Sequence, residues 1–185
     1  MATNKSNNFS LFEQERETAN PMVAVLANRL VNIRKKNIAE SLSDFEGSAH
    51  KLESVKFINS IEFVDDSSSN NVNSVWYALQ RMTKPTVWIT NIDKVEDITD
   101  DIIAQVREKV KAIVMQGIYN MDVYDKLASL EIPVYVEMNI QDAVSQAYYA
   151  CDRNYVVLFS PGVKGTAQMT YRERGDKFKE AVAQL

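Results

Sequence analysis

Strand-like and helix-like hydrophobic patterns alternate along most of the chain. Two alternating runs, LESVKFI and IEFVDD, are separated by Asn59 and Ser60 and predict a hairpin of paired strands. Further strands are predicted at residues 86–90, 111–117, 133–138 and 155–161. The pattern predicts helices at 71–82, 98–110, 119–130 and 139–151, and a last one from about Arg172 to Leu185. This alternation is typical of a doubly wound, Rossmann-like α/β fold with a mostly parallel sheet and flanking helices.

The chain before the first predicted strand follows a different pattern. Residues 1–19 are polar and lack periodicity, which predicts a flexible leader. In residues 20–46, apolar side chains recur at near-helical spacing with basic residues between them, which predicts an N-terminal helical extension of one or two helices. These helices should end before Gly47, because glycine favours the position after a helix. We therefore expect a leader, a helical linker region and an α/β domain over residues 47–185.

Composition and charge narrow the class of protein. A chain of 185 residues with 45% hydrophobic and 25% charged residues is typical of one globular domain with an extension. The net charge is −4 and the basic residues are scattered, so we expect no nucleic-acid partner. The longest apolar runs are strand-sized and the N-terminus is polar, which predicts neither a membrane span nor a secretory signal. The single Cys151 suits a reducing compartment, so the expected location is the cytoplasm.

Candidate binding groups lie where the predicted strands end, because ligands of such sheets bind at the carboxyl ends of the strands. The run DDSSSNN, residues 65–71, has two possible roles. It could hold an anion at the start of the following helix, or Ser69, Asn70 or Asn71 could simply cap that helix. Lys94, in NIDKVED, could bind a carboxylate or phosphate or lie in a solvated turn.

Several other kinds of site are not indicated by the sequence. SPGVKGT does not have the residue order of a P-loop, and G-x-G-x-x-G is absent. Cys151 ends a predicted helix far in sequence from the lone His50, so we expect a buried cysteine and not a nucleophile. No cluster has metal-ligand spacing, so no metal site is expected. Trp76, Tyr77 and Trp88 are expected to face the core.

Three segments, in order, resemble the C-terminal domain of the Mur ligases, specifically those that add D-glutamate. NIRKKNIAESLSDFEGSAHKLE resembles the linker and H-R-x-E stretch of that domain. FINSIEFVDDSSSNNVNSVWYAL resembles the F-I-N-D-S-K-[AG]-T-N region, and YRERGDKFKEAV resembles Y-E-D-R-G-D-x-F-K. The resemblance covers roughly residues 20–185 and implies a Rossmann-like domain that delivers the amino acid while a separate central domain holds ATP.

The resemblance also implies binding residues at the matching positions of this chain. For the substrate these are Lys94, Asn70 and Tyr171. For the nucleotide they are Lys51, Asp66, Ser67 and Asn71. No catalytic residue is implied.

Several groups of the family pattern are replaced in this sequence. Ser68 and Asn70 stand where the family has Lys and Thr, and Lys51 stands where it has Arg, which loses the planar guanidinium fork. The glycines of G-G-x-D-K-G have become Asn91, Ile92 and Val95, so close backbone approach to a ligand should be hindered. The S-P-A-x-A-S loop is changed to SPGVKGT, which leaves its serine without a clear counterpart.

These changes lead to three expectations about function. The first is a noncatalytic binding or regulatory module whose partner is a cell-wall ligase or another protein. No UDP-binding or ATPase segment is recognised, so we expect no ligation and no bound cofactor alone, with ATP and Mg²⁺ only if an ATPase domain complements the chain. The second is a true amino-acid-binding part of an ATP-dependent D-glutamate ligase, working with separate ATPase and UDP-binding chains. The third is a remnant without selected activity.

Overall fold

The chain divides into two compact units, Met1–Ser41 and Leu42–Leu185. The computed structural model describes residues 21–43, 48–166 and 168–185. The described part of the first unit is a single helix, α1 (Pro21–Ser43), in the region where one or two helices were predicted. The predicted leader and the predicted helix end at Gly47 lie outside the described residues.

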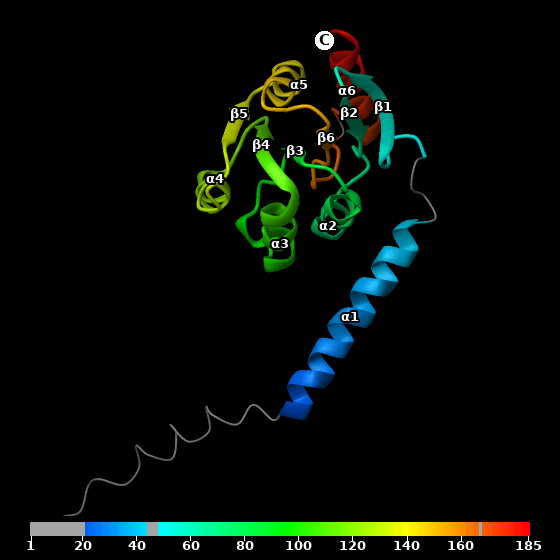
Figure 1. Ribbon diagram of the computed structural model, residues 1–185, viewed down its shortest axis with the longest axis vertical. Helices are drawn as coiled ribbons and strands as arrows, with labels where there is room; N and C mark the ends of the chain where they lie inside the picture. The colour runs from blue at the N-terminus through cyan, green and yellow to red at the C-terminus, as the bar shows by residue number, and fades with distance from the viewer. Residues whose placement is uncertain (1–20, 44–47, 167) are drawn as a thin grey trace, which may run out of the picture. The chain divides into compact units, whose positions relative to one another are not determined.

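The second unit is built on one six-stranded sheet, shown in Figure 1. Its strands are β1 (Glu53–Ile58), β2 (Ile61–Asp65), β3 (Thr86–Thr90), β4 (Val110–Gln116), β5 (Val134–Glu137) and β6 (Val156–Phe159). Their order in the sheet is β1-β2-β6-β3-β4-β5. β1 and β2 pair antiparallel, and every other neighbouring pair is parallel. The predicted hairpin and the mostly parallel sheet are therefore confirmed.

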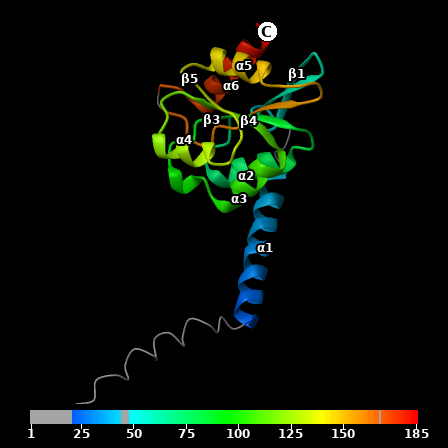
Figure 2. The ribbon, with the colours of Figure 1, turned by 60° about the vertical axis from the view of Figure 1, so that its left-hand side comes forward.

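Helices cover both faces of this sheet, as Figures 1 and 2 show. On one face lie α5 (Ile140–Tyr149) and α6 (Tyr171–Ala183), and on the other α2 (Val72–Arg81) and α3 (Asp100–Lys109). The short α4 (Met121–Ala128) packs beside β5, and a single 3₁₀ turn, η2 (Val95–Asp97), follows β3. Each predicted helix and strand of this unit is present, with ends within two residues of the prediction. The α/β class is confirmed.

Central strands are apolar on both faces because helices bury both. All residues of β3 and β6 are buried. On the α5–α6 face, the Phe159 and Phe178 rings stack with centroids 5.1 Å apart. Trp88 is fully buried, and its Nε1 donates to the Ser160 carbonyl at 2.9 Å. Trp76, Tyr77 and Trp88 all lie in the core, as predicted.

Among the described helices, none combines the length and the apolar character that crossing a bilayer requires.

Candidate functional site

Two loops leave the sheet side by side because β2 and β6 are parallel neighbours. Asp65 at the end of β2 pairs in register with Phe159 at the end of β6. The Asp66 backbone N–H also donates to the Phe159 carbonyl at 2.8 Å. The loop that follows β2 therefore meets the loop that leads from β6 into α6. This is the carboxyl edge where a ligand site was predicted.

The Asp66 carboxylate lies at the centre of this junction and is only 2% exposed. Its Oδ2 accepts hydrogen bonds from Ser160 Oγ at 2.7 Å and from Ser69 Oγ, and its Oδ1 accepts one from the Leu52 N–H at 3.3 Å. Burial raises the pKa of Asp66 to about 7, although these hydrogen bonds oppose the shift. The carboxylate thus joins three chain segments, and a nucleotide contact by it would compete with these hydrogen bonds.

His50, which precedes the first strand, is brought against the same junction. Its Nδ1 lies 2.9 Å from Asp65 Oδ2, and its Nε2 lies 3.7 Å from Asp176 of α6. Asp65 also accepts a hydrogen bond from the Ser67 N–H at 2.9 Å. The imidazole meets the Tyr171 ring edge-on, with centroids 6.1 Å apart. The sequence analysis considered His50 only in relation to Cys151 and did not predict this long-range contact with Asp65.

A group of possible metal ligands adjoins His50. Atoms of His50, Glu53 and Asp65 lie within 4.8 Å of one another. The Lys179 ammonium, however, is 2.7 Å from Glu53 and 3.9 Å from Asp65, so the chain supplies its own cation there. Burial opposes ionisation of Glu53, but hydrogen bonds from Lys179 and the His50 N–H prevail and lower its pKa. The carboxylates of Glu53 and Asp65 thus already have a cationic neighbour in Lys179.

Arg174, from α6, connects the two loops. Its Nη2 donates to the Ser67 carbonyl at 2.6 Å and its Nη1 to the Val163 carbonyl at 3.1 Å. Burial lowers the pKa of this guanidinium to about 10, with the charges of Asp65 and Asp66 opposing the shift. A planar fork with several donors suits two carbonyls on different segments. The side chain therefore sets the spacing of the two loops.

Gly175 allows α6 to approach this junction closely. A Cβ at Gly175 would collide with His50 Nδ1 and Ser67 Oγ and would lie 2.7 Å from Asp65 Oδ2. Any side chain would push the helix away from these groups, because all three belong to buried residues and His50 Nδ1 and Asp65 Oδ2 are hydrogen-bonded to each other. In the R-G-D triplet, Arg174 thus hydrogen-bonds to both loops, and Gly175 allows α6 to lie close to the junction.

The remaining residues of the β2 loop differ in their exposure. Asn71 caps α2, with its side chain accepting from the Ser74 N–H at 3.1 Å, so one of the predicted capping residues is the cap. Asn70 is exposed, whereas Ser67 is fully buried. Lys51 is half-buried in the turn before β1. Of the residues implied for nucleotide binding, Asp66 and Ser67 thus face inward.

The loop after β3 carries Lys94 at the same edge of the sheet. The Lys94 side chain is exposed and makes no hydrogen bond or ion pair with the residues that the structure describes, whereas its backbone carbonyl accepts from the Asp97 N–H at 3.1 Å. Asn91 braces the loop: its Nδ2 donates to the Gln116 backbone carbonyl and side-chain Oε1, both at 2.6 Å. Ile92 is buried, and a Cβ on Gly162, whose φ is +76°, would lie only 2.7 Å from it. Two residues that replace glycines of the family pattern thus serve packing.

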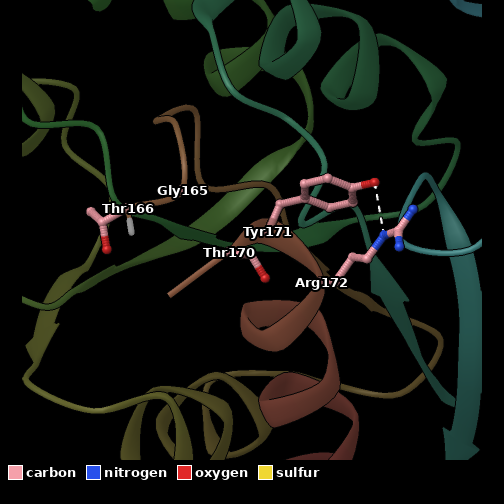
Figure 3. A pocket seen from close by; sticks show the side chains of 5 residues that line it. All are labelled: Gly165, Thr166, Thr170, Tyr171 and Arg172. Carbon is pink, nitrogen blue, oxygen red and sulfur yellow. Dashed lines mark hydrogen bonds between the residues drawn. The ribbon is translucent and has the colours of Figure 1, made fainter. Parts of the chain in front are cut away.

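An open pocket of about 450 Å³ lies where α6 begins, as Figure 3 shows. It is lined by Gly165, Thr166, Thr170, Tyr171 and Arg172. Arg172 Nε donates to the Tyr171 hydroxyl at 3.2 Å. Thr170 and Glu173 form a capping box, so the chain's own carboxylate already accepts from the helix start. The pocket offers a ring and a guanidinium, and the capping box already engages the N–H groups of Thr170 and Glu173.

Cys151 follows α5 and is half-buried against the core. Burial, with the neighbouring charge of Asp152, raises the pKa of its thiol to about 12. A thiol with this pKa carries almost no thiolate at neutral pH, so its chemistry is that of a packed, unreactive cysteine.

The chain is similar in sequence to several ligases that have the same name. No family model matches the sequence. The chain is similar to the UDP-N-acetylmuramoylalanine–D-glutamate ligases of Christiangramia forsetii, with 37% identity over 168 residues, and of Bacteroides thetaiotaomicron, with 40% identity over 169 residues. Each match covers 90% of this chain but only 38% of the ligase. The chain therefore spans well under half the length of these relatives.

The fold is also similar to that of a solved ligase structure. The UDP-N-acetylmuramate–alanine ligase of Thermotoga maritima is similar with a TM-score of 0.51 and 18% identity, over 78% of this chain and 32% of that one. The α/β unit is thus a domain of the Mur ligase type. In particular, the chain is a homologue of the UDP-N-acetylmuramoylalanine–D-glutamate ligases and corresponds to a domain like their C-terminal one.

Proposed function

We propose that the chain serves the D-glutamate-adding step of peptidoglycan precursor synthesis as a noncatalytic binding or regulatory module. Homology over 90% of its length supports the step. The observation that carries the noncatalytic part is the state of Asp66: its carboxylate is buried and accepts three hydrogen bonds from the chain itself. A buried carboxylate engaged in this way contributes to the fold, and a ligand at Asp66 would compete with these hydrogen bonds.

The neighbouring replacements support the same conclusion. Ser68 stands in place of the family lysine, and a serine hydroxyl cannot neutralise phosphate charge. Asn91 and Ile92 fill space that glycines leave open in the family pattern. The chain keeps the Rossmann-like core, while Asn91 and Ile92 at the carboxyl edge hydrogen-bond to and pack against other parts of the fold. The module acts by contact with another protein, without cofactor of its own, and its location is the cytoplasm.

Calorimetric titration of the chain into the intact D-glutamate ligase of Bacteroides fragilis tests this function. We expect saturable heat of association and a changed rate of D-glutamate addition by that ligase. An unrelated acidic protein of similar size is the control for charge. Absence of both association and rate change across several cell-wall ligases contradicts the proposal.

A second candidate function is supported by Lys94. Its ammonium is exposed at the carboxyl edge and is not engaged by the described residues, so it remains able to hold a carboxylate. In this alternative the chain is the amino-acid-binding part of a split ligase, with ATP and Mg²⁺ held by a separate ATPase chain. D-Glutamate should then bind the unmutated protein, and Lys94→Ala should weaken that binding. Lys111→Ala, which removes another exposed ammonium, is the matched control. Flat titrations of the unmutated protein exclude this alternative.

A further inference from the structure

Four exposed large hydrophobic side chains of the α/β unit lie at the ends of two neighbouring strands. Ile118, Tyr119, Met121 and Met138 have exposed fractions of 90, 41, 59 and 65%. Ile118 and Tyr119 lie in the loop after β4, Met121 begins α4, and Met138 directly follows β5, the parallel neighbour of β4. We call these four residues the rim patch. Single exposed apolar residues are normal, whereas a cluster of them marks an interaction surface.

Hydrogen bonds hold these two loops in place. The Gly117 N–H donates to the Glu137 carbonyl at 2.8 Å, and Gln116 Nε2 donates to the Met138 carbonyl at 3.3 Å. Asn120 caps α4 through the Asp122 N–H and donates from its Nδ2 to the Asp93 carbonyl at 3.2 Å. The apolar side chains therefore stand on a braced scaffold, which lowers the ordering cost of association.

The charges around the rim patch are mostly acidic. Residues 117–142 contain five acidic side chains and one lysine. The lysine, Lys126, donates to the Val95 carbonyl at 3.2 Å, whereas Asp122 and Asp142 are exposed beside the patch in the first turns of α4 and α5. A two-fold contact with a second copy would set acid against acid, which is unfavourable. A basic surface complements this rim.

We propose that the rim patch docks a partner protein whose contact surface carries apolar side chains flanked by lysine or arginine. This inference rests on the proposed function, since it names the surface through which the module meets its partner. The patch is continuous with the candidate site, because Asn120 and Asn91 tie its loop to the loop of Lys94. A docked partner therefore lies beside Lys94, at the edge of the sheet where the site loops emerge.

Two helical peptides with the same leucine face test the chemistry of the partner. One has lysine and the other glutamate on its polar face, and each is titrated with the full chain by fluorescence anisotropy. We expect the lysine peptide to bind at least about tenfold more tightly. The double variant Ile118→Ser/Met138→Ser should weaken its binding by about tenfold or more. Tyr149→Ser, at a residue that is 79% exposed and lies outside the patch, should not.

Three results overturn the inference. They are equal binding of the two peptides, binding that the double variant leaves unchanged, and self-association of the chain in sedimentation that the double variant abolishes, which assigns the patch to a second copy. Failure of the proposed function is distinguishable. If the intact ligase binds the unmutated chain and the double variant equally, only the patch is wrong. If no cell-wall ligase binds the unmutated chain, the function is wrong whatever the peptides do.

Discussion

The loops that follow β2 and β3 leave the same edge of the sheet, yet their charged side chains have opposite fates. In the first, Asp66 is buried and hydrogen-bonded to three segments. In the second, Lys94 is exposed and not engaged by the described residues. A carboxylate with short, fixed partners is retained by the fold itself, whereas an exposed ammonium costs the fold nothing to keep or lose. The contacts of Asp66 therefore give it a role in the fold, whereas the fold gives no such role to the Lys94 ammonium.

The largest effect that tests this contrast is expected at Gly175. Gly175→Ala inserts a Cβ against His50, Ser67 and Asp65, which are buried and of which His50 and Asp65 are hydrogen-bonded to each other. We expect a loss of about 3 kcal/mol in the free energy of unfolding, measured by urea denaturation. Glu180→Ala, on the exposed side of α6, is the control and should have no effect. A stable Gly175→Ala protein would mean that the junction is loosely packed.

The second-largest loss of stability is expected when the Arg174 side chain is removed. Arg174→Ala leaves the Ser67 carbonyl without its 2.6 Å donor and the Val163 carbonyl without its 3.1 Å donor. The expected loss is about 2 kcal/mol in the free energy of unfolding, with faster amide exchange in both loops. Arg172→Ala removes a fully exposed guanidinium two residues away and should leave stability unchanged. Equal behaviour of the two variants would break the contrast between buried and exposed charges.

The pH dependence of stability should report Asp66 directly. Its pKa is raised from 3.8 to about 7, so the folded protein keeps a proton that the unfolded chain loses between these values. This contribution to stability is complete below pH 4 and is lost as the pH rises to about 7. The slope is at most about 1.4 kcal/mol per pH unit. Asp66→Asn should flatten this part of the profile, and an unchanged profile would show that another group titrates.

The smallest effect is expected at Lys94. Lys94→Ala should change the free energy of unfolding by no more than about 0.5 kcal/mol, because an exposed side chain without a partner contributes little. Urea denaturation measures this change on the same scale as the variants of the junction. A clear destabilisation would show that Lys94, like Asp66, serves the fold, and would remove the reason to connect it with a ligand.

The sequence predicted the positions of the loops around the candidate site and one of its local contacts. The loops at the carboxyl edge were found, and Asn71 was among the residues predicted to cap α2. The roles of His50 and Arg174 were missed, because each acts on residues far away in sequence: His50 on Asp65, and Arg174 on the Ser67 carbonyl. The R-G-D triplet was noticed through its resemblance to the family pattern. No local pattern indicates, however, that its arginine joins two loops.

The sequence by itself determined the elements and the hairpin, because both depend on neighbouring residues. Apolar periodicity sets which stretches form helices or strands, and Asn59 and Ser60 adopt positive φ angles of 49° and 69°, as a tight two-residue turn requires. Only the tertiary structure decided which polar groups are buried. The hydrogen bond from Ser160 to Asp66 spans 94 residues and exists because β6 inserts between β2 and β3. Strand order is a property of the whole packed sheet, which no single segment encodes.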